Sequence, residues 1–158
     1  MTIALTKGKV ALVDDPDAAL VAAFSWQAVL CKGRWYARAG RREGKRMIHT
    51  YMHRLLLGLP RRRPMVDHKN GDGLDNRREN LRLATSTQNA WNMESRRGST
   101  SRYKGVSRAK RFGWQAQISV GGRNKHLGFF HSEEDAARVY DAKAAVLFGA
   151  YARLNFPE

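Results

Sequence analysis

Side chains that together could hydrolyse a phosphodiester bond occur within one short stretch of the chain, residues 65–92. Asp67 and His68 are adjacent, and Asn89 follows further along the stretch. Carboxylate and carboxamide oxygens are hard ligands, so they suit Mg²⁺ or Mn²⁺ better than zinc. A neutral imidazole beside such an ion can accept a proton from water near pH 7, while the ion stabilises the charge on the phosphate. We therefore predict that Asp67 and Asn89 bind one divalent ion, Mg²⁺ or Mn²⁺, and that His68 is the general base.

The sequence around these side chains predicts a strand, a loop, a second strand and a helix. The first strand ends at His68, and Asn70–Gly73 has the composition of a turn. Leu81–Leu83 alternates apolar and charged residues, as a second strand should. Thr85–Thr87 can cap a helix that carries Asn89. This order of elements brings the Asp-His pair on the first strand close to the asparagine on the helix.

The sequence VDHKNGDGLDNRRENLRLATSTQN, residues 66–89, resembles the HNH endonuclease motif. It matches the variant with Asn in the last position, which is common in phage and intron-borne homing endonucleases. The resemblance implies a ββα-metal fold with His68 as general base and with Asp67 and Asn89 as metal ligands. It also implies that Asn80 holds the loop so that His68 is correctly oriented. A loop histidine bonded to a neighbouring aspartate would look the same at the Asp-His pair alone, so a decayed or purely structural site is the alternative.

The chain lacks the paired cysteines with which many members of this family bind a structural zinc ion. Cys31 is the only cysteine, so we expect no structural zinc and no intramolecular disulfide. The HNH segment must then be held by packing against the N-terminal part of the chain. We expect Cys31 to be a small buried apolar residue, and we assign Asn76 a structural role in the loop.

The charge of the chain favours a nucleic-acid partner. Its 158 residues include 29 Lys and Arg against 14 Asp and Glu, which gives a formal net charge of +15. Such a charge repels itself in the folded state unless an anionic partner neutralises it, and the first candidate is the phosphate backbone of nucleic acid. An anionic membrane is the alternative. The sequence shows no long apolar run, signal peptide or lipidation motif, so we expect an intracellular protein in the cytoplasm of the bacterial host of a phage or mobile element.

Residues 1–60 predict a small β-rich lobe. Two short strands turn at Lys7–Lys9, and a hairpin turns near Lys32-Gly33. Asp15 should cap a short helix over Ala18–Trp26 with Pro16 at its first position. The remaining predicted elements are a strand through Met47 and Ile48 and a short helix that ends at Gly58. We assign His49 and His53 structural roles, because neither has a partner at metal-ligand spacing.

The C-terminal segment predicts a three-stranded sheet covered by one helix. We expect strands over Tyr103–Ser107, Trp114–Val120 and Lys125–Phe129, followed by a helix that Ser132 caps. Ala136, Tyr140, Ala144, Leu147 and Phe148 form an apolar stripe for packing on the sheet. The motifs YKGV, WQAQI, LGFF, EEDAARVYDAKA and ARLNF resemble the Apetala-two/ethylene-response-factor DNA-binding domain. That resemblance implies that the sheet face opposite the helix enters the DNA major groove.

The basic and polar residues of these segments supply candidate DNA contacts. Lys104 matches a basic contact position of the plant family, but several other positions depart from its Arg, Trp or Glu, so the plant target sequence does not carry over. The departing positions are Ser107, Ala109, Arg111, Gln117, Ser119, Asn124 and His126. We expect Trp114, Phe129 and Phe130 to be core residues and His131 to be structural. The predicted DNA-binding residues are Arg61, Arg62, Arg63, Arg77, Arg78, Arg82, Lys104, Arg108, Lys110, Arg111, Gln117, Ser119, Arg123, Lys125 and His126.

These observations predict an α+β protein that cuts DNA. The predicted segments are a β-rich lobe (1–60), an HNH ββα-metal core (61–92), a basic linker (93–102) and an ethylene-response-factor-like domain (103–158). The linker either lies along DNA or is a plain solvated tether. We expect a metal-dependent endonuclease that nicks one strand of double-stranded DNA per active site. It should act as a monomer or weak homodimer, without a small-molecule cofactor or a membrane partner. The alternatives are a non-catalytic DNA-binding regulator and an RNA-directed enzyme or binder.

Overall fold

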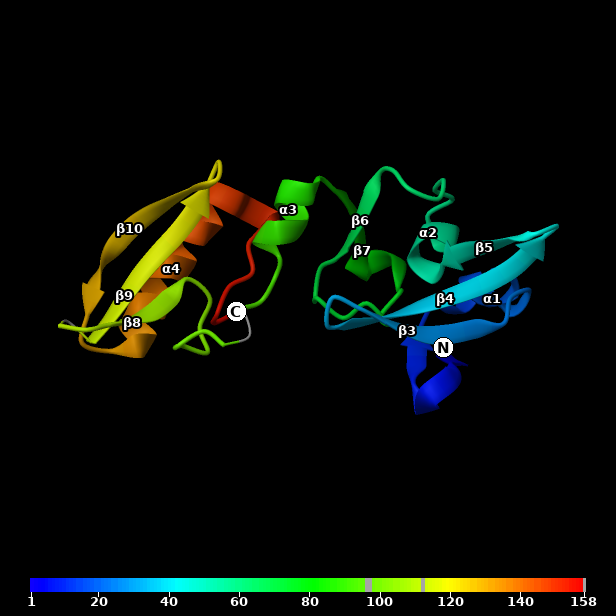
Figure 1. The fold of residues 1–158 in the computed structure, drawn as a ribbon, viewed down its shortest axis with the longest axis horizontal. Helices are drawn as coiled ribbons and strands as arrows, with labels where there is room; N and C mark the ends of the chain where they lie inside the picture. The colour runs from blue at the N-terminus through cyan, green and yellow to red at the C-terminus, as the bar shows by residue number, and fades with distance from the viewer. Residues whose placement is uncertain (96–97, 112, 158) are drawn as a thin grey trace. The chain divides into compact units, whose positions relative to one another are not determined.

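The chain folds into two compact units, Met1–Ser86 and Thr87–Glu158, which we call the first unit and the second unit. The computed structural model describes residues 1–95, 98–111 and 113–157. Each unit combines antiparallel strands with helices, so the predicted α+β class is confirmed (Figure 1). The predicted boundary at residue 60 falls inside the first unit, and the predicted linker belongs to the second. Arg96 and Arg97 of that linker lie outside the described residues.

The first unit contains three small antiparallel sheets and two short helices. The sheets are β1-β2, β3-β4-β5 and β6-β7. In chain order, the strands and helices of this unit are β1 (Thr2–Ala4), β2 (Val10–Leu12), α1 (Ala18–Ala22), β3 (Trp26–Cys31), β4 (Arg34–Glu43), β5 (Arg46–Tyr51), α2 (Met52–Leu56), β6 (Met65–His68) and β7 (Leu81–Ala84). Single 3-10 turns lie at Thr6–Gly8, Asp15–Asp17 and Arg78–Asn80.

Three predictions about this unit are wrong. The helix predicted over Ala18–Trp26 ends at Ala22, because the Trp26 indole nitrogen donates to the Val21 carbonyl oxygen at 2.9 Å and the chain turns into β3 there. Asp14, not Asp15, precedes the 3-10 turn, and it makes no side-chain cap. Cys31 is exposed, since it is the last residue of β3 beside the hairpin turn.

One core joins the HNH segment to the N-terminal strands. Buried apolar residues of this core range in the chain from Leu5 to Leu81 and include Leu74 of the loop between β6 and β7. The same loop runs along β2: the Leu12 amide donates to the Leu74 carbonyl at 2.9 Å, and the Asn76 amide donates to the Leu12 carbonyl at 2.8 Å. The HNH segment is therefore held by packing against the N-terminal residues, as the lack of cysteine pairs predicted.

The second unit is a three-stranded sheet with one long helix. Its elements are α3 (Ser86–Trp91), which starts at the last residue of the first unit, β8 (Val106–Ala109), β9 (Gly113–Val120), β10 (Arg123–Phe130) and α4 (Glu133–Phe148), which a 3-10 turn at Gly149–Tyr151 follows. The sheet order is β10-β9-β8, and α4 packs on one face of it (Figure 1). The Ser132 hydroxyl caps α4 by accepting a hydrogen bond from the Asp135 amide at 3.2 Å.

Two details of the second unit differ from the prediction. β8 begins at Val106 rather than Tyr103, because Gly105 has φ +76° and a Cβ there would lie 2.0 Å from the Tyr140 ring. The helix stripe packs through Ala136, Tyr140, Ala144 and Phe148, whereas Leu147 is 37% exposed. Among the described residues, no helix is long and apolar enough to cross a membrane.

Candidate active site

The centre of the candidate site is His68, the buried last residue of β6. Its Nε2 lies 3.5 Å from Asn76 Oδ1, across the loop that connects β6 to β7. Asn76 is fully buried, and its Nδ2 donates to the Leu74 carbonyl at 3.0 Å. This bond fixes the orientation of the Asn76 amide, so that its oxygen faces the imidazole. An oxygen can only accept a hydrogen bond, and therefore Nε2 carries the proton and the lone pair lies on Nδ1.

An aromatic cluster from the neighbouring elements surrounds the His68 ring. His53 on α2 lies edge-on to it with ring centroids 5.1 Å apart, and Tyr36 on β4 lies 5.9 Å from it. Tyr51 completes the cluster by stacking on His53 at 5.5 Å. The sequence pattern predicts a structural role for His53 and does not connect it with His68. Only the fold brings the two together, since α2 and β6 are separated by the arginine-rich loop.

Burial makes both histidines of the cluster weak bases. It lowers the pKa of His68, and it lowers the pKa of His53 to about 3, with the neighbouring His68 as a further cause. The Nδ1 of His53 is buried and has no hydrogen-bond partner among the residues that the structure describes. The positive form of either ring is thus disfavoured. Both imidazoles are neutral near pH 7, which is the state that a general base requires.

We expect His53→Phe to reduce the acid sensitivity of the first unit. The unfolded chain protonates His53 near pH 6.5, whereas the folded chain does so near pH 3, so stability falls as the pH drops below 6.5. Phenylalanine removes this proton uptake. As the pH falls from 6 to 4, the free energy of unfolding of the wild type should decrease relative to that of the variant by up to about 1.4 kcal/mol per pH unit. Urea unfolding followed through the amide NMR signals of β6 and β7 measures the difference. If the free energies of unfolding of the wild type and the variant changed with pH in parallel, the pKa of His53 would be the same in the folded and unfolded chains.

The predicted metal ligand Asp67 is buried beside an arginine. Asp67 and Arg82 face each other across β6 and β7, and Arg82 Nε and Nη2 lie 2.8 Å and 2.6 Å from Asp67 Oδ2. The Asp67 side chain is 2% exposed and that of Arg82 is 13% exposed. A carboxylate is a hard donor, and Mg²⁺ binds to one or two protein oxygens while it keeps several waters. The donor type of Asp67 suits such an ion, and binding of the ion by Asp67 stays a prediction.

Asparagines hold the loop that follows His68. The Asn80 side chain accepts from the Asn70 amide at 3.0 Å and donates to Asn70 Oδ1 at 3.0 Å and to the Asp75 carbonyl at 2.7 Å. Asp75 is buried and pairs with Arg77 at 2.7 Å, which lowers the pKa of Asp75. The HNH resemblance implies a loop-holding role for Asn80, and Asn80 makes hydrogen bonds within this loop. The residue that contacts the imidazole itself is Asn76.

The second predicted metal ligand lies in the other unit. Asn89 is a half-buried residue of α3, and all of that helix except Ser86 belongs to the second unit, where Trp91 stacks on Phe148 at 4.5 Å. Asp67 and His68 belong to the first unit. The structure therefore brings together Asp67, His68 and the Asn80 loop, and the pairing of Asn89 with Asp67 stays a prediction.

The predicted DNA-binding residues of the first unit fall into two groups. Arg61, Arg62 and Arg63 are exposed in a loop that buried Arg54 anchors, through hydrogen bonds to the carbonyls of Pro60 and Pro64. The other three each pair with a buried aspartate: Arg77 with Asp75, Arg78 with Asp17 at 2.7 Å, and Arg82 with Asp67. These pairs fix the loop, and phosphate contacts by the same arginines stay a prediction.

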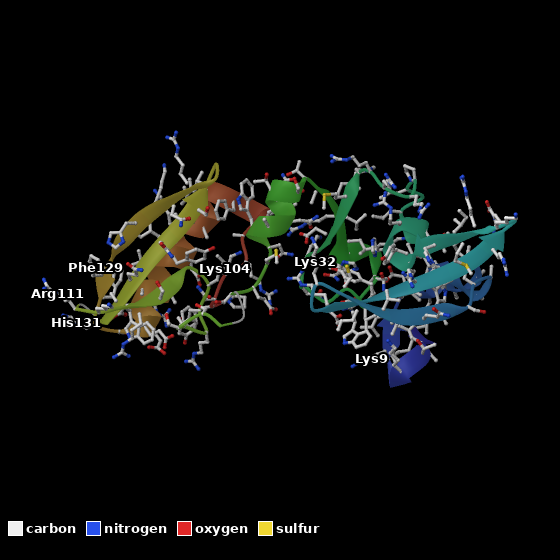
Figure 2. The ribbon with its side chains drawn as sticks, viewed as in Figure 1. Lys9, Lys32, Lys104, Arg111, Phe129 and His131 are labelled. Atoms are coloured by element: carbon white, nitrogen blue, oxygen red, sulfur yellow. The ribbon has the colours of Figure 1, made fainter. Side chains whose placement is uncertain are left out.

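The predicted DNA-binding residues of the second unit divide between the two sides of the sheet. Gln117, Ser119 and His126 lie on the face opposite α4, whereas Arg123 and Lys125 pair with Val120 and Ile118, whose side chains pack on the α4 side. Arg108 lies over the Trp114 ring at 5.2 Å, and the Lys104 ammonium donates to the Trp91 carbonyl. Lys110 and Arg111 are exposed in the turn between β8 and β9 (Figure 2).

One aromatic residue of this sheet was wrongly predicted. Phe129 is 49% exposed instead of belonging to the core, and its ring lies 4.5 Å from that of His126 (Figure 2). Trp114 and Phe130 do pack against the core, as predicted.

Known proteins are similar to this chain in its HNH segment and in a second, shorter segment. A model of the HNH endonuclease family matches residues 50–91. An uncharacterized HNH endonuclease of Acanthamoeba polyphaga mimivirus is 32% identical over 113 residues, which cover 71% of this chain and 58% of that protein. Protein 3.8 of Escherichia phage T7 is 33% identical over 91 residues, which cover 57% of this chain and 74% of that protein.

A plant protein matches a shorter part of the chain. Dehydration-responsive element-binding protein 2C of Arabidopsis thaliana is 46% identical over 59 residues, which cover 35% of this chain and 17% of that protein. The matched HNH model includes α2, β6, β7 and α3, and so it includes His53, His68 and Asn89. The chain belongs to the HNH endonuclease family and also carries a segment similar to a plant dehydration-responsive element-binding protein.

Proposed function

We propose that the protein is a metal-dependent endonuclease that nicks one strand of double-stranded DNA at each active site. The observation that carries the proposal is the buried, neutral His68, whose Nε2 faces Asn76 Oδ1 beside the Asp67–Arg82 pair. This pair of a base and a carboxylate lies within the segment that matches the HNH family. A buried histidine with a fixed tautomer can also be purely structural, so it is the position of His68 within the matched HNH segment that favours a catalytic role.

In the proposed reaction, His68 Nδ1 accepts a proton from a water molecule. The water oxygen forms a bond to phosphorus, and the bond from phosphorus to the 3′ oxygen breaks. The leaving 3′ oxygen takes a proton from solvent and His68 returns its proton to solvent, so that the products carry a 5′ phosphate and a 3′ hydroxyl. Asn76 keeps the proton of the imidazole on Nε2, so that Nδ1 has the lone pair for the transfer. Tyr36 and His53 hold the ring edge-on and keep its surroundings apolar.

Asp67 and Asn89 would hold the divalent ion, which is Mg²⁺ or Mn²⁺ in this proposal. When bound, the ion supplies positive charge that stabilises the phosphate and the leaving oxygen. Arg82 holds Asp67 Oδ2 and so fixes the direction of the carboxylate. The role of Asn89 rests on its position in the HNH motif, because Asn89 belongs to the second unit and Asp67 to the first.

Two parts of the chain, which do not coincide with the two compact units, divide the work in this proposal. Residues 1–92 cut, and residues 103–158 bind the target DNA through the sheet face opposite α4. The arginines and lysines predicted above contact phosphates, and they account for part of the net charge of +15. One HNH site per chain makes one nick per binding event, so a double-strand break needs two chains or two events. The phage and viral relatives suggest a bacterial or host cytoplasm as the place of action.

A nicking assay on supercoiled plasmid tests the proposal. The full chain is incubated with Mg²⁺, with Mn²⁺ and with EDTA, and open circles are separated from supercoils. The proposal requires nicking with a divalent ion and none with EDTA. If the protein binds duplex DNA tightly but cuts neither plasmid nor a mixture of genomic DNAs, it is a DNA-binding regulator instead. Competition with duplex RNA tests the third alternative, because an RNA-directed protein would release DNA.

A further inference from the structure

We propose that the second unit reads A·T base pairs in the major groove and that Phe129 recognises the methyl group of a thymine. The inference rests on the proposed function, because it names the DNA that the sheet face selects. It comes from a β-bulge in β10 and from the chemistry of the side chains that face away from α4.

The bulge turns Phe129 outward. His126 pairs with Gln117, but Gly128, not Leu127, pairs with Ala116, so Leu127 is the extra residue of β10. Without the bulge, Phe129 would pair with Trp114 on the face that packs against α4. With the bulge, it pairs with Gln115 on the opposite face and is 49% exposed. An extra residue in one strand reverses the facing of every residue that follows it.

The outer face is neutral and carries amide, hydroxyl, imidazole and phenyl groups. Alternation from the buried Ala116 and Ile118 assigns the outer positions of β9, and cross-strand pairing assigns those of β8 and β10. None of the described outward positions on the three strands is Arg or Lys. They are Ser107, Ala109, Gln115, Gln117, Ser119, Asn124, His126 and Phe129.

The chemistry of this face favours A·T over G·C pairs. Arg and Lys make the commonest specific contact with guanine, whereas Gln and Asn pair with adenine N6 and N7, and apolar groups contact the thymine methyl. The side-chain carboxamide of Gln117 has no hydrogen-bond partner among the described residues, whereas its backbone amide donates to the Gly105 carbonyl at 2.8 Å. Its neighbours His126 and Phe129 lie 4.5 Å apart by ring centroids. An adenine contact and a thymine-methyl contact are therefore available next to each other.

Cations border the neutral face, which favours duplex DNA over an apolar protein partner. Lys110 and Arg111 are exposed at the β8–β9 turn, and Arg123 and Lys125 are exposed at the start of β10. Phosphates lie on both sides of a major groove, so a neutral reading surface with basic ends is complementary to it.

The test selects duplexes from a randomised library with the full chain in EDTA, so that no cutting occurs. Wild type, Phe129→Ala and a control, Val146→Ala, are compared, since Val146 is an apolar residue of α4 that is 80% exposed. The expected wild-type site contains adjacent A·T pairs. We expect one thymine in it at which replacement by deoxyuridine, which lacks the methyl group, weakens wild-type binding about fourfold. Val146→Ala should show the same loss, and Phe129→Ala should bind both duplexes equally.

Three results would overturn the inference, and they differ in what they mean. A selected site of G·C pairs, or a deoxyuridine effect that persists in Phe129→Ala, would refute base reading by this face while DNA targeting stands. Failure to enrich any sequence would remove the targeting role itself. If Phe129→Ala left the selected site unchanged but weakened self-association in sedimentation, the face would be an interface between two copies of the chain.

Discussion

His68→Ala should lower the rate of metal-dependent plasmid nicking on the order of 10³-fold and leave DNA binding unchanged. His68 is the only base that the proposed reaction uses, and its lone pair is oriented by Asn76. The alanine variant retains Asp67, Arg82 and the asparagine loop. Nicking kinetics under saturating protein measure the loss, and gel-shift titration measures binding.

Two controls separate catalysis from folding. His131→Ala removes an exposed histidine of the second unit and should cut like the wild type. Imidazole added to His68→Ala should restore part of the nicking, because a free base can enter the cavity that the ring leaves. A misfolded variant would not respond to imidazole. Full activity in His68→Ala would show that the base lies elsewhere, and His53 would then be the first residue to replace.

Sequence pattern predicted the elements of the site better than the contacts within it. The strand that ends at His68, the strand that starts at Leu81 and the helix that carries Asn89 lie where alternation and capping residues placed them. The contact of His53 with His68 joins residues that are close only after folding. The hydrogen bond between Asn76 and the His68 imidazole depends on the conformation of the loop. The types of the loop residues do not determine that conformation.

The largest errors of prediction occur where one residue changes the facing of a strand. Apolar residues at the end of a predicted strand indicate core positions, and this pattern predicts that Phe129 is buried. The bulge at Leu127 reverses that assignment, and Gly128, with φ +144°, lies at the bulge. Cys31 and Leu147 show the converse, because apolar character alone does not bury a residue at the end of an element.

Gly73→Ala should destabilise the first unit by about 3 kcal/mol, which is near the upper end for overpacking. A Cβ at Gly73 would lie 2.4 Å from the Trp35 carbonyl oxygen and 2.6 Å from the Tyr36 ring. The carbonyl belongs to the backbone of β4 and cannot rotate away. Thermal unfolding should show a midpoint lower by on the order of 15 °C for a unit of this size. Gly44→Ala is the matched control, because Gly44 has φ +58° but open space around its Cβ position, and it should cost about 1 kcal/mol.

The same substitution should also damage the site at temperatures where the unit is still folded. Tyr36 contacts both Gly73 and the His68 ring, so a shift of the tyrosine moves the base. A displacement of about 1 Å at a catalytic group can lower a rate by about 100-fold. Gly44→Ala, which is remote from Tyr36 in the turn between β4 and β5, should nick at the wild-type rate. Equal stability and equal nicking in the two variants would show that the loop does not pack on β4. The close approach of Gly73 to β4 would then no longer explain how a chain without zinc-binding cysteines positions its base.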